Sequence, residues 1–268
     1  MNKLKILFFT FFAIAIMVGI YSCAKEGSSV EAKTQELTVE NRSSGSACSP
    51  ETIYPIFTGC TNVQRNIPID FSAGLDLYSN GSTLFQLCPG VQFNVYYTFT
   101  TCNFGAGKVH FVHNLTYNIA DIIAACPALQ TAINNQQALG NLVSFLDLLD
   151  FDISKQVEFT EAYNAAIQAS PTKYLCENGS EFYNIKYIKN TCYKWDAIPN
   201  PKTGEFIFVK RECNGSICCI RIGQYCVIEF SNGQPVLQFS GNSTYERKEG
   251  ECPQDCTHEC GNPNTGDI

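Results

Sequence analysis

The sequence predicts an α+β fold: a β-rich, disulfide-stapled body with a central helical segment. Segments rich in β-branched and aromatic residues lie on both sides of an alanine- and leucine-rich stretch, 117–170. The 268 residues include 15 cysteines, which is typical of chains that fold in an oxidising compartment. Only 16% of the residues are charged, which also favours an exported protein. We therefore expect disulfides to supplement a normal packed core.

The first predicted β region is 48–116. Within it, Val91–Thr101 is rich in strand formers and partly alternates between apolar and polar residues. Phe104–Gly107 is a predicted turn, and Lys108–Tyr117 is the predicted return strand. Ile67–Phe71 is strand-like and precedes a turn-rich stretch.

The helical segment 117–170 has apolar residues at spacings of three to four. We expect helices over Ile119–Ala125, Leu129–Leu149 and Val157–Ala169, the second one broken near Gly140. Pro127 suits a helix start, and the Ser-Pro pair that follows Ala169 stops the last helix.

The second predicted β region is 171–250, and a cysteine-rich tail, 251–268, follows it. The region contains a hairpin signal, Asn-Gly at 232–233 between two apolar runs. The tail is too polar to pack alone, so disulfides must hold it. We treat 48–268 as a single α+β domain. The expected strands are Phe182–Trp195, Glu205–Arg211, Ile217–Phe230 and Pro235–Phe239.

The first residues have the pattern of an export signal. Lys3 and Lys5 precede an apolar run, Ile6–Ile20, which is too short for a membrane span of roughly 20 residues. The run ends in Ile20-Tyr21-Ser22-Cys23, which resembles the lipobox of bacterial lipoproteins, although Tyr21 is bulkier than the usual occupant. The body resembles no family by its motifs.

The lipobox resemblance implies that residues 1–22 are a signal peptide cleaved before Cys23. It also implies a diacylglycerol on the Cys23 sulfur and an acyl chain, such as palmitate, on its new amino group. Residues 23–47 would then form the lipidated cysteine and a flexible tether, because they lack a sustained apolar period. The alternatives are an ordinary secretory signal cut at Ser22-Cys23-Ala24, giving a secreted protein, and an uncleaved anchor.

The number of cysteines agrees with a lipid on Cys23, because an even number, 14, then remains to form seven disulfides. A metal site in the tail around His258 and a redox-active thiol are the alternatives, but the cysteines are expected to oxidise in an oxidising compartment and no Cys-x-x-Cys spacing is present. We expect Cys218 and Cys219 to have different partners and the tail to pair with the segment 213–226. The disulfide candidates are Cys48, Cys60, Cys88, Cys102, Cys126, Cys176, Cys192, Cys213, Cys218, Cys219, Cys226, Cys252, Cys256 and Cys260.

The net charge of −7 becomes −9 after loss of Lys3 and Lys5 with the leader. An acidic chain without a basic patch argues against nucleic-acid binding. It also argues against electrostatic docking on anionic lipid, so membrane attachment would depend on the acyl chains.

Two groups of residues carry the candidate chemistry. His110 and His113 are three residues apart in a predicted strand and should lie on opposite faces, as surface or pocket-rim residues. The second group is acidic, and we interpret it as a solvated face at a helix end. Its alternatives are a glycosidase carboxylate pair and a calcium site. The acidic group comprises Asp147, Asp150, Asp152, Glu158 and Glu161.

The chain is therefore predicted to be a lipid-anchored cell-envelope protein, periplasmic or surface-exposed, that serves binding, adhesion or an accessory role. A glycan or a protein is the expected ligand, and exposed strand aromatics are candidate contacts. No cofactor, metal or catalytic residue is assigned. The alternative is an exported hydrolase that uses a His or Asp/Glu site, but no nucleophile motif accompanies these residues. The oligomeric state stays open.

Overall fold

The computed structural model describes residues 48–71, 83–105, 107–169, 173–177, 182–199, 204–215, 217–239, 244–248, 250–256, 258 and 260. These residues belong to one compact unit, Ser43–Ile268. The predicted signal peptide, Cys23 and the tether lie outside the described residues.

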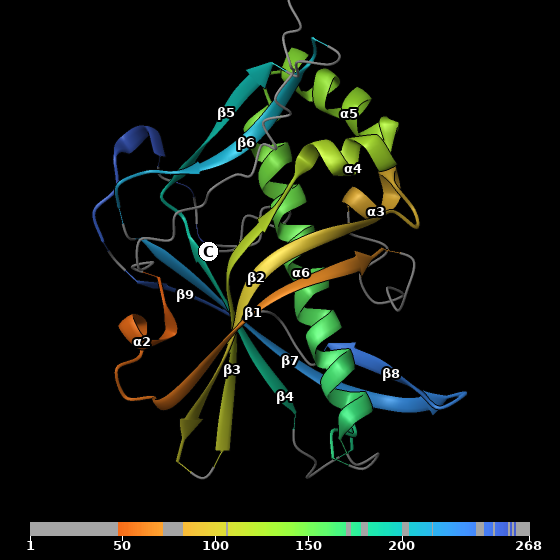
Figure 1. The fold of residues 1–268 in the computed structure, drawn as a ribbon, viewed down its shortest axis with the longest axis vertical. Coiled ribbons are helices and arrows are strands. Elements are labelled where there is room, and N and C mark those ends of the chain that lie inside the picture. Colours follow the sequence, from red (N-terminus) through yellow and green to blue (C-terminus); the bar gives the residue numbers. More distant parts are fainter. Residues whose placement is uncertain are drawn as a thin grey trace, which may run out of the picture. The chain divides into compact units, whose positions relative to one another are not determined.

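The body is built on a mixed seven-stranded sheet with the order β1-β2-β3-β4-β7-β8, and β9 lies beside β7 (Figure 1). Neighbouring strands are antiparallel except β3 and β4, which are parallel. A separate two-stranded sheet pairs β5 with β6. The strands are β1 (Thr58–Asp70), β2 (Gln92–Phe104), β3 (Gly107–Tyr117), β4 (Tyr183–Asn190), β5 (Tyr193–Pro199), β6 (Phe206–Glu212), β7 (Cys218–Ser231), β8 (Gln234–Phe239) and β9 (Thr244–Lys248).

The helices follow local start and stop signals. The Asn118 side chain accepts a hydrogen bond from the amide of Ala120 and caps α4, and Pro127 begins α5. Gly140, with φ +75°, separates α5 from α6, as its position predicts. The helices are α2 (Pro50–Ile53), α3 (Thr83–Leu87), α4 (Ile119–Ala125), α5 (Pro127–Ala138), α6 (Leu142–Gln168) and the 3₁₀ turn η1 (Gln254–Cys256).

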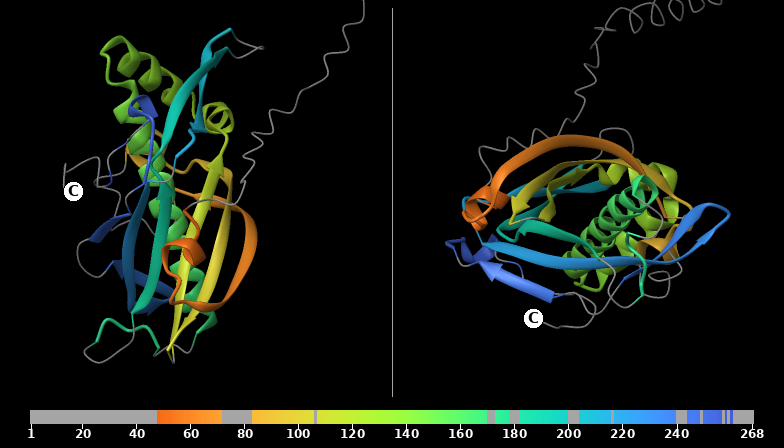
Figure 2. Two further views of the ribbon diagram at one scale, coloured as in Figure 1. Left: turned by 90° about the vertical axis from the view of Figure 1, so that its left-hand side faces the viewer. Right: turned by 90° about the horizontal axis from the view of Figure 1, so that it is seen from below.

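The sheet curls around α6, which contacts β1, β4, β7 and β8 (Figure 2). This explains why α6 does not show one apolar stripe: Leu146, Ile153 and Val157 are buried on it together with charged side chains. The β-rich α+β fold with a central helical segment is thereby confirmed. The predicted interruption of the helix between Leu149 and Val157 is wrong.

Both predicted hairpins form. β2 and β3 pair around the turn at Gly105, and β7 and β8 pair around Asn232 and Gly233, whose φ angles are +52° and +78°. The predicted strand Phe182–Trp195 is instead two strands, β4 and β5, in different sheets. Two parts of the sheet were not expected: β9 and the first half of β1. Both segments are polar, and the pairing register of β1 shifts between Thr58 and Thr61.

Seven disulfides join all fourteen predicted cysteines. Cys218 and Cys219 have different partners, as expected. Two tail cysteines pair with the segment 213–226, whereas Cys252 pairs with Cys192. Such a set indicates an oxidising, extracytoplasmic compartment. The pairs are Cys48–Cys218, Cys60–Cys102, Cys88–Cys126, Cys176–Cys226, Cys192–Cys252, Cys213–Cys256 and Cys219–Cys260.

Among the described residues, no helix is both long enough and apolar enough to cross a bilayer.

Candidate functional site

The predicted acidic face on α6 is not solvated. Asp150, Asp152, Glu158 and Glu161 are all buried, because α6 lies inside the curl of the sheet. Their positions are also not at a helix end, since α6 continues to Gln168. A buried carboxylate needs a charged or hydrogen-bonding partner, so each of them must be accounted for separately.

Asp150 is held by two lysines from different strands. Its Oδ2 lies 2.8 Å from Lys189 Nζ of β4 and 3.2 Å from Lys210 Nζ of β6, and Tyr117 donates to its Oδ1 at 3.1 Å. Burial alone would raise the pKa of Asp150, but the two ammonium groups outweigh it and hold the pKa well below its usual range. The Asp150 carboxylate therefore stays charged, and it links α6 to one strand of each sheet.

Glu158 forms a second buried link. Arg221 of β7 donates from Nε and Nη2 to Glu158 Oε1 at 2.9 and 2.8 Å, and Tyr225 donates to Oε2 at 3.3 Å. Lys155 Nζ lies 3.8 Å from Glu158 Oε2. Burial and the neighbouring Arg221 together lower the pKa of Lys155 to about 7, although Glu158 opposes them. One carboxylate thus faces two buried cationic side chains.

The remaining buried acids also have structural partners. Glu161 accepts a hydrogen bond from Tyr97 and pairs with Arg65 of β1 at 3.2 Å. Asp152 Oδ2 accepts the amide of Leu84 at 2.9 Å. Each acid on α6 contacts a different strand or helix, so the described carboxylates do not converge as a glycosidase pair would.

His258 lies against Asp147, a contact that sequence patterns did not indicate. The imidazole stacks on Tyr193 at 3.8 Å between ring centroids. Nδ1 lies 2.9 Å from Asp147 Oδ2, and Nε2 lies 2.8 Å from the carbonyl oxygen of Tyr193. Because both ring nitrogens face acceptors, His258 has no nitrogen free to act as a general base.

His113 is buried, so its expected place on the surface or a pocket rim is wrong. Thr100 Oγ1 lies 2.5 Å from Asn62 Oδ1, to which it donates, and 2.8 Å from His113 Nε2. The Thr100 hydroxyl proton is committed to Asn62, so His113 Nε2 acts as donor to Thr100. Thr100 is therefore not poised as a nucleophile activated by His113.

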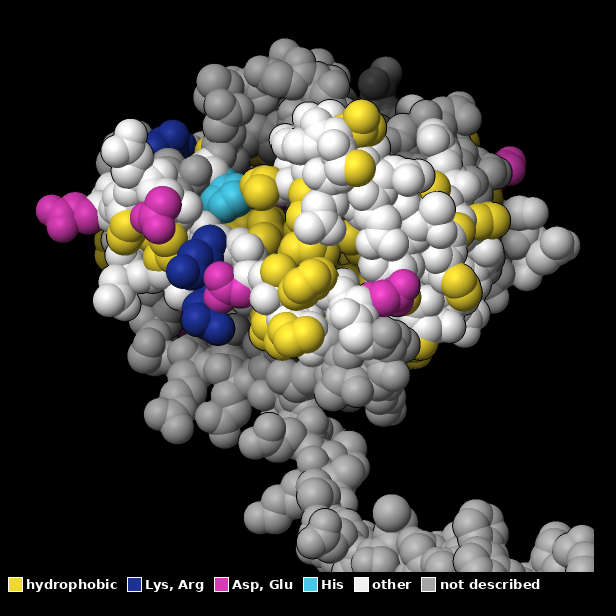
Figure 3. All heavy atoms as spheres, turned by 90° about the horizontal axis from the view of Figure 1, so that it is seen from above, with side chains coloured by type: hydrophobic (Ala, Val, Ile, Leu, Met, Phe, Trp, Pro, Cys, Tyr) yellow, Lys and Arg dark blue, Asp and Glu magenta, His cyan; other side chains and the backbone are white. Residues whose placement is uncertain are grey.

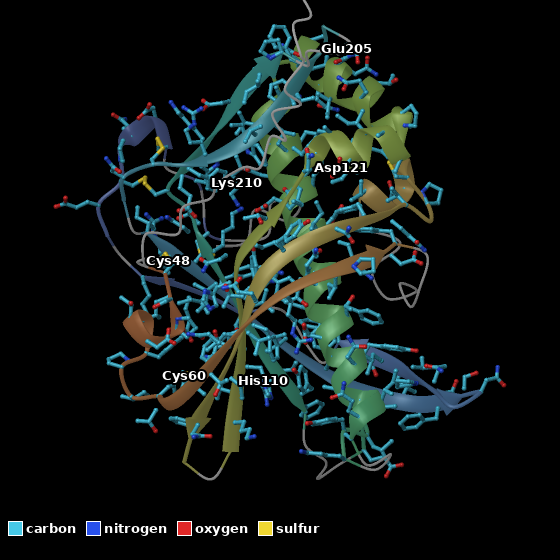
Figure 4. All side chains as sticks on the ribbon, viewed as in Figure 1. Cys48, Cys60, His110, Asp121, Glu205 and Lys210 are labelled. Carbon is cyan, nitrogen blue, oxygen red and sulfur yellow. A yellow bond between two sulfur atoms is a disulfide. The ribbon has the colours of Figure 1, made fainter. Side chains whose placement is uncertain are left out.

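His110 occupies the other face of the sheet, as its spacing predicts. Its ring is stacked between Phe99 and Tyr183, with centroids 5.6 and 5.0 Å away. Figure 4 shows His110 far from Lys210, which pairs with Asp150, so His110 and Asp150 do not meet. Burial, together with the charge of Lys108, lowers the pKa of His110 to about 4.

This lowered pKa makes the fold sensitive to acid. Between about pH 6.5, the value for an unfolded histidine, and about 4, the unfolded chain binds more protons at His110, so stability falls as pH decreases. His110→Phe keeps the ring stack without titrating. We expect urea unfolding to show a smaller loss of stability between pH 7.5 and 4.5 in the variant than in the wild type. An equal loss would contradict the assignment to His110.

The proposed alternative of a metal site in the tail does not fit the structure. Cys252, Cys256 and Cys260 are all oxidised in disulfides and cannot serve as thiolate ligands. Nor do His, Cys, Asp and Glu side chains gather as a ligand set anywhere in the described ranges.

A pocket of about 430 Å³ lies where the two ends of the curled sheet approach each other. Its walls are one face of α6, the end of β1 and the β7–β8 hairpin. β1 and β8 are the two ends of the strand order, and each contributes a proline, Pro68 and Pro235. Proline cannot donate to a ladder, so these edges are poorly suited to pair with each other and close the sheet. The other lining residues are Asp70, Gln156, Phe159, Thr160, Tyr163, Asn164, Ser231, Gln234 and Val236.

Gln156 of α6 lines this pocket and also fixes it to β1. The side chain is only 4% exposed, and its Nε2 donates to the carbonyl oxygen of Asp70 at 2.9 Å. Its Oε1 is buried and has no hydrogen-bond partner among the described residues. A buried acceptor without a donor costs about 1–3 kcal/mol of stability, and this atom is shielded from the open part of the pocket.

The mouth of the pocket is bridged by a polar contact. Tyr163 of α6 donates to Gln234 Oε1 of β8. Phe159 packs beside Tyr163, with ring centroids 6.2 Å apart and planes inclined by 26°. The helix therefore supplies an aromatic wall, and the hairpin supplies amide and hydroxyl groups opposite it.

The strand aromatics are mostly core residues, as expected: Tyr97, Phe99, Tyr183, Tyr187 and Tyr193 are buried. Figure 3 shows apolar side chains gathered on the end of the body near β5, β6, α4 and α5. The pocket is the stronger candidate site, because it combines a concave shape with apolar walls and a few polar groups.

Sequence reasoning missed this pocket. Gln156, Phe159 and Tyr163 follow helical spacing on α6, but nothing local indicates which strands lie opposite them. The comparisons give no relative from which to transfer a site: neither a protein-family model nor a curated protein nor a solved structure matches the chain.

Proposed function

We propose that this chain is a lipid-anchored cell-envelope protein that binds a ligand in the pocket between α6, β1 and the β7–β8 hairpin. The single observation that carries the binding role is the pocket itself, a concave site of about 430 Å³ whose apolar walls carry a few amide and hydroxyl groups. The anchor rests on the lipobox-like Ile20-Tyr21-Ser22-Cys23 and on the even number of cysteines that remain after Cys23. The seven disulfides fit an extracytoplasmic body.

A binding role is favoured over the exported hydrolase by what the candidate catalytic groups contact. The three histidines are stacked, paired or hydrogen-bonded within the fold. The buried acids of α6 are held by Lys189, Lys210, Arg221 and Arg65. The two lysines hold the pKa of Asp150 well below its usual range, which restricts this carboxylate as a proton donor.

A small-molecule library screened by thermal shift tests this function, because a ligand that binds only the folded protein raises Tm. Val236 lines the pocket and is 37% exposed, so Val236→Trp should block the site. Val63→Trp, at a residue that is 47% exposed and does not line the pocket, is the matched control. We expect compounds that raise Tm of the wild type and Val63→Trp but not of Val236→Trp.

Two results would overturn the binding role. One is a set of compounds that raise Tm of all three proteins equally, which would place binding outside the pocket. The other is a library in which no compound stabilises the wild type.

A further inference from the structure

The charge on the pocket walls restricts the ligand. This step rests on the proposed function, since it concerns the occupant of the same pocket. Asp70, at the end of β1, is the one charged residue among the lining residues that the structure describes, and it is half buried. Gln92 Nε2 donates to its Oδ2 at 2.6 Å, and a neutral amide donor leaves the negative charge of the carboxylate in place. The walls therefore attract a cation and repel an anion.

The charges around the pocket favour the same sign of ligand. Lysine, arginine and histidine are absent from the described lining residues. The one lysine of α6, Lys155, directs its ammonium group elsewhere: Nζ lies 4.5 Å from the centroid of the Phe239 ring and 3.8 Å from Glu158 Oε2. The whole chain is also acidic, with a net charge of −7 before the loss of any leader. An acidic protein raises the local concentration of cations around it.

Two hydroxyl groups of α6 add hydrogen-bond acceptors to the same walls, because their protons are already used within the fold. Thr160 Oγ1 donates to the carbonyl oxygen of Gln156 at 2.8 Å. Tyr163 donates to Gln234 Oε1 of β8. Each hydroxyl oxygen keeps lone pairs but has no second proton, so it can only accept from a ligand. Thr160 and Tyr163 line the pocket and are half buried, so both keep accessible surface.

The accessible apolar part of the lining comes from Pro68 of β1 and Val236 of β8, one residue from each edge strand. Both side chains are exposed. They can cover a small hydrocarbon group that enters between the two strands. The volume of about 430 Å³ lies in the range of small-molecule sites, about 300–1,000 Å³. A matching ligand therefore has a compact apolar part beside its charge.

We infer that the pocket binds a protonated primary amine carried on a small apolar group. An ammonium group combines a positive charge, which matches Asp70, with three N–H donors, which match the carboxylate and the hydroxyl oxygens of Thr160 and Tyr163. The hydrocarbon part packs against Pro68 and Val236. A quaternary ammonium has the charge without the N–H donors, and an alcohol has a donor without the charge, so both bind more weakly.

Probes that share one hydrocarbon group and differ in charge test this inference. They are cyclohexylmethylamine, its N-trimethylated form, cyclohexylmethanol and cyclohexanecarboxylate. Calorimetry uses the detergent-solubilised full-length mature protein with its disulfides intact, and the same micelles are present in both solutions. We expect the amine to bind about tenfold more tightly than the alcohol, and the carboxylate to bind most weakly.

Asp70→Asn tests the source of the charge preference. We expect the tenfold preference for the amine over the alcohol to disappear, while the affinity for the alcohol stays within about twofold. A purely structural role for Asp70 would weaken both probes together. Asp121→Asn is the matched control, because it removes the same charge from an exposed residue of α4 that does not line the pocket. It should keep the preference.

Thr160→Val provides a second variant, which tests the hydrogen bonds rather than the charge. It keeps the shape of the side chain and removes the hydroxyl oxygen, so the affinity for the amine should fall by about threefold. The affinity for the trimethylated form, which has no N–H to donate, should not change. Thermal unfolding without a probe checks that each variant is folded, and the probe series on the wild type decides the charge preference in any case.

The inference is overturned if the amine does not bind, if the alcohol or the carboxylate binds as tightly as the amine, or if Asp121→Asn removes the preference as Asp70→Asn does. In these cases the proposed function still stands if library compounds distinguish Val236→Trp from Val63→Trp. If that screen also fails, both the ligand class and the pocket are wrong.

Discussion

Replacing Glu158 by Gln is expected to lower the free energy of unfolding by about 3–5 kcal/mol, the cost of leaving a buried charge without its partner. Arg221 is 4% exposed at its side chain and Glu158 is fully buried, so water cannot replace the lost carboxylate. Lys155 lies near the same carboxylate and would lose this charged neighbour too. Chemical denaturation with the disulfides intact measures the change.

Asp196→Asn is the matched control for this prediction. Asp196 also pairs with an arginine, Arg211, at 2.8 Å, but the Arg211 side chain is 64% exposed. A solvent-exposed pair contributes about 0–1 kcal/mol, so this variant should be close to the wild type. A loss below 1 kcal/mol for Glu158→Gln would contradict a stabilising role for the buried pair.

The disulfide between Cys48 and Cys218 is expected to have the second large effect. It joins residues 170 apart in sequence and ties the start of the body to β7. Replacing both cysteines with Ala removes a constraint on the unfolded chain. The expected loss is about 2–5 kcal/mol of unfolding free energy.

Cys60–Cys102 provides the comparison, because it links neighbouring strands only 42 residues apart in sequence. If the constraint on the unfolded chain dominates, removal of Cys48–Cys218 lowers the unfolding free energy more than removal of Cys60–Cys102. The same loss in both double variants would show that loop length does not determine their contribution.

Local signals predicted the helical centre and the hairpins. Gly140 separates two helices, and Asn232-Gly233 adopts the positive φ angles that such a hairpin turn needs. These features depend on residues close together in the chain. The fold class and the participation of fourteen cysteines in disulfides were also predictable, because composition and short-range patterns are enough to indicate them.

The continuity of α6 was not predictable from local patterns. Asp150, Asp152 and Lys155 interrupt the apolar spacing and suggest a solvated break. They are buried because partners such as Lys189 and Arg221 come from strands that follow much later in the sequence. Only the tertiary fold brings these partners close to the buried charges. The local sequence alone therefore wrongly indicates that the charged residues are solvated.

The pocket was unpredictable for a related reason. Its walls come from β1, α6 and the β7–β8 hairpin, and it exists because the curled sheet leaves its two edge strands apart. Gln156 looks like an ordinary polar helix residue in the sequence. Its place in the wall of the pocket follows only from the tertiary fold.

We propose an exported body that is attached through Cys23 and held by seven disulfides. Both features are tested by the intact mass of the protein from native membranes, alkylated without reduction. We expect a chain that begins at Cys23, carries acyl chains and has no alkylated thiol. A chain that begins at Lys25, has no lipid and carries alkylated cysteines would contradict both the anchor and the disulfide set.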